Sequence, residues 1–159
     1  MKAMILAAGL GTRLRPHTNF VPKSLFTIAE RPVLDILICS LISAGYDKIV
    51  INTHHLAVNI ASFLNSRQYS VPIFTSYEPE ILGTGGAIKK AAPLLGKRPF
   101  LVTNSDIVTD IDFKSVYNFH LNHGHPVTMV LIDQPRFNSV LCDERGFVGD
   151  FRSPDKKGE

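Results

Sequence analysis

Apolar runs of strand length alternate with segments of helical periodicity along most of this 159-residue chain. The apolar runs are continuous, which is typical of strands buried on both faces of a sheet. Such sheets are mainly parallel and are covered by helices on both sides, because each crossover between parallel strands needs a long connection. The sequence therefore predicts an α/β fold, a Rossmann-like three-layer sandwich with a mainly parallel mixed sheet.

The ends of the expected elements follow from local signals. A proline in the first turn and a glycine after the last apolar residue delimit a helix at 32–44. Asp112 and Gly124 are expected to cap the last helix. An antiparallel hairpin is expected from 137–142 and 147–151. Strands are expected at 3–8, 48–52, 71–77, 100–103 and 127–132, and helices at 32–44, 56–64, 84–95 and 112–121.

A glycine-rich loop follows the first strand, and cations follow the loop. Gly9 and Gly11 end the apolar run, and Arg13, Arg15 and Lys23 come next. Backbone N–H groups at the end of a buried strand bind anions, and cations behind them neutralise phosphate charge. The glycines alone are also compatible with a simple tight turn, but the cations in the same stretch favour a site for a nucleoside triphosphate.

Two familiar phosphate-binding loops do not fit these residues. The dinucleotide fingerprint G-x-G-x-x-G requires a third glycine, and Leu14 stands in its place. The Walker loop requires G-x-x-x-x-G before Lys-Ser, whereas Lys23-Ser24 follows Pro22 without such glycines. The loop therefore belongs to neither class.

The stretch LAAGLGTRLRP, followed by VPKSL, resembles the signature of the sugar-1-phosphate nucleotidyltransferases. The family pattern is a strand, then x-A-G-x-G-T-R-L-x-P, then a P-K pair. The matching residues are Gly9, Gly11, Thr12, Arg13, Leu14, Pro16, Pro22 and Lys23. The resemblance implies the nucleotide-diphospho-sugar transferase fold. It covers nearly all of this chain but only the front part of a family domain, so residues 1–159 are interpreted as one C-terminally incomplete nucleotidyltransferase domain.

Asp106 is the predicted metal ligand. With Asn104 and Ser105 it closes the apolar strand at 100–103, and the carboxyl ends of parallel strands meet at one sheet edge. Mg²⁺ is commonly held by one or two carboxylates together with phosphate oxygens and water. A turn aspartate that caps its own backbone is the alternative. The resemblance implies the metal role, since the family has a metal-binding x-G-D motif here, with Ser105 in place of the glycine.

A second glycine-rich stretch, Leu82–Ala87, opens the helix at 84–95. Free N–H groups at a helix start can hold a phosphate or a base edge, although composition alone equally fits a flexible loop. The resemblance implies contacts to nucleobase and sugar, which places Thr84 and Gly85 at the nucleotide. Glu78 and Glu80 precede this stretch. They are within reach of sugar hydroxyls in one interpretation, but the favoured interpretation is that they are exposed loop carboxylates.

Two further stretches are similar to the muramic-acid-phosphate uridylyltransferase branch of the family. The first is TDIDF at Thr109–Phe113, in which Asp110 and Asp112 are interpreted as caps rather than metal ligands. The second is Asn138-Ser139, which aligns with a sugar-contacting segment.

The resemblance implies a reaction and a site. The phosphate of a sugar 1-phosphate attacks the α-phosphorus of a nucleoside triphosphate, and pyrophosphate leaves. Arg13 is expected at the β- and γ-phosphates, Lys23 at the α-phosphate and the incoming phosphate, and Asp106 on Mg²⁺. The expected nucleotide-binding residues are Ala8, Gly9, Gly11, Thr12, Arg13, Lys23, Thr84, Gly85 and Asn104.

Two other interpretations of function remain open at this point. The family's second metal-binding aspartate and much of its sugar pocket lie beyond the part matched here. A nucleotide-binding module without turnover is therefore the second hypothesis, and a structural fragment that binds no nucleotide is the third.

Composition narrows the partners. The net charge of +3 suits an anionic small molecule and is too diffuse for nucleic-acid binding. Apolar residues make up 45% of the chain, but no apolar run reaches the roughly eighteen residues of a membrane span. The two cysteines, Cys39 and Cys142, form no disulfide framework, which favours the cytoplasm. An unfinished sheet edge favours homo-oligomers.

Histidines occur in two groups, and a structural role is the favoured interpretation of both. His54 and His55 are adjacent, while His120, His123 and His125 surround a helix end. The spacing of the second group matches neither zinc fingers nor H-E-x-x-H, and a helix C-terminus favours histidine through its dipole.

Overall fold

The computed structural model describes residues 1–136 and 138–151. The chain divides into two compact units, Met1–His125 and a second unit that begins at Pro126.

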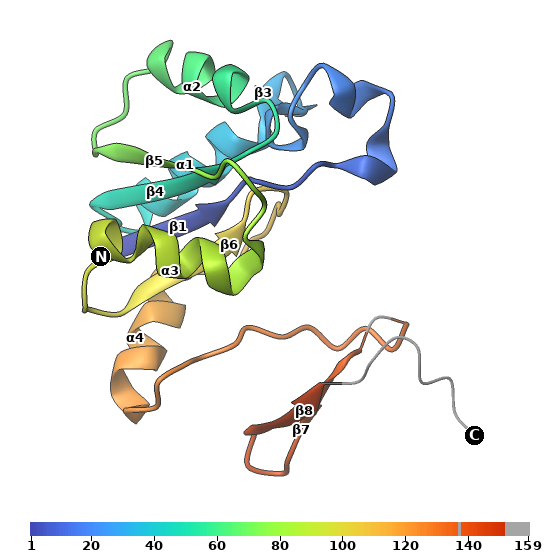
Figure 1. Cartoon of the computed structure of the whole chain (residues 1–159). Helices are drawn as coiled ribbons and strands as arrows, with labels where there is room; N and C mark the ends of the chain where they lie inside the picture. Colours follow the sequence, from blue (N-terminus) through green and yellow to red (C-terminus); the bar gives the residue numbers. More distant parts are fainter. Residues whose placement is uncertain (137, 152–159) are drawn as a thin grey trace. The chain divides into compact units, whose positions relative to one another are not determined.

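A parallel sheet of four strands forms the centre of the first unit (Figure 1). Its strands are β1 (Lys2–Leu6), β4 (Lys48–Thr53), β5 (Ile73–Tyr77) and β6 (Phe100–Asn104). The order is β5-β4-β1-β6, and Lys2 is in register with Lys48 on one side and with Phe100 on the other. The chain thus winds outward from β1 in both directions, which makes the end of β1 the point where ligands bind in such sheets.

Helices cover both faces of this sheet, as a three-layer sandwich requires. They are α1 (Val33–Ser43), α2 (Ala57–Asn65), α3 (Gly83–Leu95) and α4 (Phe113–His123). Alternate residues of β1 face opposite layers: Ala3 and Ile5 pack with α1 and with Ile60 of α2, whereas Met4 packs with α3. The predicted fold class is therefore confirmed.

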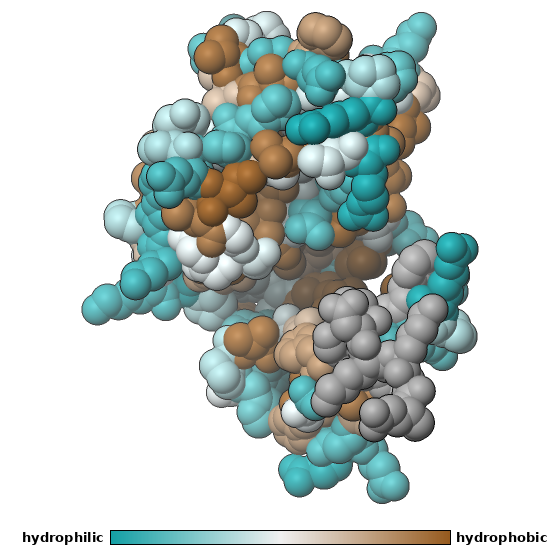
Figure 2. Space-filling model, turned by 45° about the vertical axis from the view of Figure 1, so that its right-hand side comes forward, coloured by the Kyte–Doolittle hydropathy of each residue, from teal (hydrophilic) through white to brown (hydrophobic). Residues whose placement is uncertain are grey.

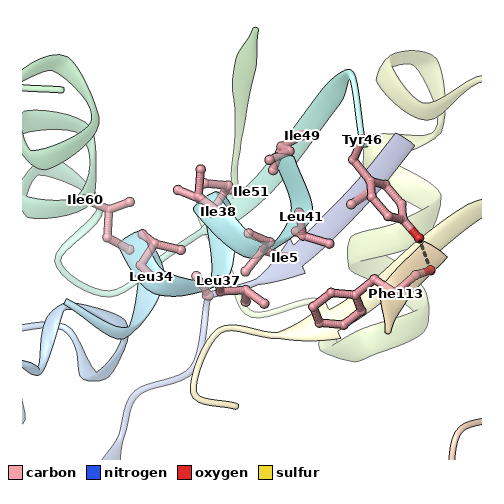
Figure 3. Packing of buried hydrophobic residues seen from close by; sticks show 12 residues of the cluster. Ile5, Leu34, Leu37, Ile38, Leu41, Tyr46, Ile49, Ile51, Ile60 and Phe113 are labelled. Atoms are coloured by element: carbon pink, nitrogen blue, oxygen red, sulfur yellow. Dashed lines mark hydrogen bonds between the residues drawn. The ribbon is translucent and has the colours of Figure 1, made fainter. Parts of the chain in front are cut away.

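The larger core cluster lies between α1 and the sheet (Figure 3). Tyr46 joins this cluster to the start of α4. It is 1% exposed, and its hydroxyl donates to the Phe113 carbonyl oxygen over 3.1 Å. Its ring meets Tyr117 edge to face at 6.1 Å. Burial raises the pKa of Tyr46 to about 12, so the hydroxyl remains a donor across the physiological range.

The connection from β1 to α1 contains three short 3₁₀ turns: Thr12–Leu14, His17–Asn19 and Lys23–Leu25. A small hairpin follows, β2 (Thr27–Ile28) with β3 (Arg31–Pro32), which the sequence did not predict. Its two turn residues, Ala29 and Glu30, have φ of 47° and 64°. Two-residue turns of this conformation normally use asparagine or glycine, so the usual signal is missing.

The hairpin is fixed to α1 by a polar network around Asp35. Arg31 Nη2 donates to Asp35 Oδ2 over 2.8 Å, and Tyr69 donates to Asp35 Oδ1 over 2.8 Å. Burial raises the pKa of Asp35, but the hydrogen bonds from Arg31 and Tyr69 outweigh burial and hold this pKa below its usual value. The network anchors the hairpin that follows the 3₁₀ turn containing Lys23.

Most predicted elements differ from the observed ones by only one or two residues at their ends. Asp112 caps α4 by accepting from the backbone N–H groups of Lys114 and Ser115, and Gly124 ends the helix with φ of 70°. Both predicted caps are therefore confirmed.

The strand predicted at 127–132 is wrong. The structure assigns no strand there, and Val127 and Ile132 are 71% and 85% exposed. An apolar run becomes a strand only when it pairs with a neighbour, and the four-stranded sheet ends at β6. Apolar side chains reach the surface of both units in Figure 2.

The second unit contains the predicted hairpin, formed by β7 (Val140–Cys142) and β8 (Val148–Phe151) in antiparallel pairing. Gly146, with φ of 81°, donates to the Asp143 carbonyl oxygen over 3.0 Å and closes the turn. The first strand begins at Val140 rather than at 137, a position that lies outside the described residues. None of the helices in the described part of the chain combines the length and apolar character needed to cross a bilayer.

Substitution Tyr46→Phe tests the link between the core and α4. It removes the hydrogen bond from the Tyr46 hydroxyl to the Phe113 carbonyl oxygen, so we expect the free energy of unfolding to fall by about 0.5 to 1.5 kcal/mol. Urea denaturation followed by circular dichroism measures it. Tyr77→Phe is the control, because Tyr77 is 55% exposed, and its effect should stay within about 0.5 kcal/mol. Equal midpoints for the two variants would contradict the assignment.

Candidate active site

A cavity of about 370 Å³ opens at the carboxyl ends of the strands in the first unit. Its walls come from the loop after β1, from Lys23 and Ser24, from the turn between β5 and α3, and from the end of β6. All the predicted site residues line it except Gly85, which lies within the first turn of α3. Stretches that are far apart in the sequence therefore converge as expected.

Lys23 and Asp106 contact each other directly across this cavity. Lys23 Nζ donates to Asp106 Oδ2, although the two residues are 83 positions apart. Their side chains are 40% and 35% exposed, and ion pairs this open to solvent contribute about 0 to 1 kcal/mol. The pair therefore places two complementary charges at one site. Each of the two residues can leave the other and bind a different partner at little cost in free energy.

The loop after β1 needs glycine at Gly11 and leaves open space beside Gly9. Gly11 has φ of 63°, and a Cβ there would lie 2.8 Å from Thr18 Cγ2. Nothing lies within 4 Å of a Cβ built on Gly9. Thr18, which the sequence did not single out, is 1% exposed and donates from Oγ1 to the Gly11 carbonyl oxygen over 2.9 Å. The loop is thus shaped by a buried contact behind it.

Glu78 is not the exposed loop carboxylate that we expected. It is 1% exposed and lines the cavity. Asn52 Nδ2 donates to Oε1 over 2.8 Å, and the Leu82 backbone N–H donates to Oε2 over 3.1 Å. These hydrogen bonds make burial of a carboxylate tolerable. Glu80 is exposed, as predicted.

Asn52 was missed by the sequence interpretation. It lies in β4, lines the cavity and accepts the backbone N–H of Ala7 on Oδ1 over 2.7 Å. One amide therefore connects the end of β1 to Glu78. Parallel register places Asn52 beside Leu6, and register between distant strands is not visible in the sequence.

Ser24 is a second residue that the sequence did not assign. It lines the cavity and is 2% exposed, and its hydroxyl has no hydrogen-bond partner among the described residues. A buried hydroxyl without a partner costs free energy. A polar ligand that gives this hydroxyl a hydrogen-bond partner would remove that cost, which supports a binding site here.

The geometry agrees with comparisons to known proteins. A family model described as nucleotidyl transferase matches residues 2–139. This chain belongs to that family.

Curated relatives extend the match within the nucleotidyl transferases. The chain is 42% identical over 147 residues to a mannose-1-phosphate guanyltransferase of Aspergillus oryzae, which covers 89% of this chain and 40% of the relative. It is 46% identical over 121 residues to the N-acetylmuramate alpha-1-phosphate uridylyltransferase of Neisseria meningitidis serogroup B, covering 74% of this chain and 52% of the relative. The chain thus spans between two fifths and about half of these relatives' length.

A solved structure shows the same fold. The complex of HddC from Yersinia pseudotuberculosis with GMP-PN superposes with a TM-score of 0.78 at 26% identity, covering 96% of this chain and 68% of that one. The sequence resemblance, including its restriction to the front part of the family domain, is therefore confirmed.

The donors at this cavity are of the kind that can hold a divalent cation together with phosphate oxygens. Asp106 supplies one carboxylate at the cavity. No group of three or more His, Cys, Asp or Glu within the described ranges could hold a metal by itself. Mg²⁺ in phosphate-transfer sites needs only one or two carboxylates beside phosphate oxygens and water. His120 and His123 meet edge to face with ring centroids 5.3 Å apart, and His125, just after α4, stacks on His123 at 5.1 Å. They form no such group.

Substitution Gly11→Ala tests the loop against Gly9→Ala. Alanine at Gly11 must adopt a left-handed conformation and meets Thr18, so we expect a loss of about 1 to 2 kcal/mol in the free energy of unfolding. Alanine at Gly9 projects into open space and should change stability by less than about 0.5 kcal/mol. Urea denaturation of both variants measures the difference. Equal changes in stability for the two variants would contradict the close contact between Gly11 and Thr18.

Proposed function

We propose that this chain forms the nucleotide-binding part of a sugar-1-phosphate nucleotidyltransferase. The observation that carries the proposal is the meeting of Lys23 with Asp106 at a cavity that the glycine loop also lines. Family membership and the activities for which the curated relatives are named support it.

In the proposed reaction, an oxygen of the sugar 1-phosphate attacks the α-phosphorus of a nucleoside triphosphate. A new P–O bond forms, the bond between the α-phosphorus and its bridging oxygen breaks, and pyrophosphate leaves. The nucleophile is already an anion, so no general base is required. The protein contributes by positioning the reactants and neutralising charge.

Each of the three charged residues has a proposed role. Arg13 binds the β- and γ-phosphates, and Lys23 binds the α-phosphate and the incoming phosphate. Asp106 holds Mg²⁺, which when bound neutralises triphosphate charge as a Lewis acid. Backbone N–H groups of Gly9, Gly11 and Thr12 hold phosphate oxygens. Lys23 must leave Asp106 to take this role, and the exposed ion pair allows the exchange.

The proposal extends to the setting of the protein. The chain acts in the cytoplasm on a nucleoside triphosphate and a sugar 1-phosphate, without a nucleic-acid or membrane partner. The mild net charge and the absence of disulfide spacing support this view. The outer strands β5 and β6 offer edges for self-association.

Pyrophosphate release with GTP, UTP, ATP, CTP and dTTP, each with Mg²⁺ and a panel of sugar 1-phosphates, tests the activity. One triphosphate should release pyrophosphate only when a sugar 1-phosphate is present. Binding without release would favour the nucleotide-binding module instead, and neither binding nor release would contradict both hypotheses.

Substitution Arg13→Ala should lower turnover by roughly a hundredfold or more, because one charge contact to the leaving group is lost in the transition state. Arg15→Ala is the matched control: Arg15 lies two positions further on, is exposed and does not line the cavity. The pyrophosphate assay measures both variants. Equal turnover for Arg13→Ala and wild type would overturn the role of Arg13.

Substitution Lys23→Met should have opposite effects on two ligands. Without nucleotide, it frees Asp106 and should raise Mn²⁺ affinity by up to about fivefold. With Mg²⁺ present, it should weaken triphosphate binding, because a phosphate contact is lost. Titration calorimetry measures both, with Lys89→Met on the exposed surface of α3 as control. A fall in Mn²⁺ affinity would show that Lys23 does not compete for Asp106.

A further inference from the structure

Two adjacent histidines connect the end of β4 to two different walls of the cavity. His54 Nδ1 lies 2.8 Å from the carbonyl oxygen of Glu78, and His55 Nε2 lies 2.8 Å from the carbonyl oxygen of Thr18. Both rings are partly buried. We propose that His54 and His55 are positioning residues that hold these two walls for the bound triphosphate. The inference rests on the proposed function, since it assigns a role in the same site.

The contact from His55 reaches the phosphate loop through one residue. Thr18 accepts from His55 with its carbonyl oxygen and donates from its hydroxyl to the Gly11 carbonyl oxygen over 2.9 Å. The Thr18 methyl also lies behind Gly11, where an added Cβ would be only 2.8 Å away. Movement of Thr18 therefore moves the backbone that is expected to hold phosphate.

The surrounding segment has few other anchors. Phe20, two residues after Thr18, is 75% exposed. Asn59 of α2 donates to the Phe20 carbonyl oxygen over 3.1 Å, but this contact is exposed. The contact from His55 is partly buried, so it restrains this segment more strongly than the exposed contact from Asn59 does.

The contact from His54 reaches the opposite wall. Glu78 accepts from His54 with its backbone carbonyl, and its side chain accepts from Asn52 and from the backbone N–H of Leu82. Leu82 is the residue before α3, whose first residues Gly83 and Thr84 line the cavity. His54 therefore helps to fix the start of α3.

The backbone at the end of β4 explains how neighbouring side chains reach both walls. His54 directly follows β4, and His55 already lies in the turn that leads to α2, so the chain changes direction between the two rings. Leu56, with φ of 52°, is the N-cap residue directly before α2. A left-handed conformation at a non-glycine residue persists where its surroundings fix it, and the two histidine contacts lie directly before it.

The chemistry of these contacts does not depend on the charge of the rings. A carbonyl oxygen only accepts, so His54 must carry a hydrogen on Nδ1 and His55 on Nε2. Each neutral ring can do so as one tautomer, and the protonated ring carries both hydrogens. The role is therefore geometric, and a neutral amide of the right reach should replace each ring.

Side-chain length provides a matched set of variants. The amide nitrogen of asparagine reaches about as far as His Nδ1, and that of glutamine about as far as His Nε2. His54→Asn and His55→Gln should therefore retain the contacts. His54→Gln and His55→Asn carry the same amide group at a different distance from the backbone, so they should lose the contacts to the carbonyl oxygens.

Titration calorimetry in the presence of Mg²⁺ measures the affinity of each variant for inorganic tripolyphosphate, GTP and UTP. The titrations are run on folded protein, under conditions below the urea and thermal midpoints of every variant. His55→Asn should weaken both tripolyphosphate and the nucleotide that binds by about threefold to tenfold, as expected for one lost hydrogen bond. His54→Gln should weaken the nucleotide by a similar factor and leave tripolyphosphate unchanged. The length-matched variants should bind like wild type.

A purely structural role predicts a different result. In that case the mismatched variants unfold at lower urea concentration but bind all probes like wild type, which would overturn the inference. Failure of wild type to bind any probe would overturn it as well. Wild type that binds tripolyphosphate and nucleotide but releases no pyrophosphate would contradict the proposed function alone, and the variant series would still decide the role of the histidines.

Discussion

The site depends on the pairing of β1 with a parallel neighbour on each side. Because β4 and β6 run in the same direction as β1, their carboxyl ends meet at one sheet edge. Asp106, which follows β6, is thereby brought to Lys23, and Asn52 of β4 is brought to the end of β1. A change in the order of these strands would separate the residues without altering any of their local conformations.

The parts of the site that the sequence predicted are those that local rules decide. A glycine loop after a buried strand and a carboxylate at the end of another are both short-range patterns. The rule that parallel strands end at one edge then joins them. Residues such as Gly11, Lys23 and Asp106 could therefore be placed in one cavity, which the structure confirms for their position. Their chemical roles remain predictions.

The parts that were missed depend on contacts between distant or atypical residues. Asn52 and a backbone N–H donate hydrogen bonds to the Glu78 carboxylate, so this side chain can be buried. These contacts follow from the register of distant strands and not from composition. The turn at Ala29 and Glu30 lacks the residues that usually mark a two-residue hairpin turn. The run 127–132 has the composition of a strand, but pairing decides whether a strand forms.

That last run has a practical consequence for work with this polypeptide. Val127–Ile132 contains no charge, proline or glycine and is rich in β-branched and aliphatic residues, yet it lies outside the strand ladders of the described chain with most of its large side chains accessible to solvent. Segments of this composition nucleate intermolecular β-structure. The chain should therefore precipitate sooner at higher protein concentration. A lysine introduced among these residues should slow that precipitation, because its charge opposes intermolecular strand pairing.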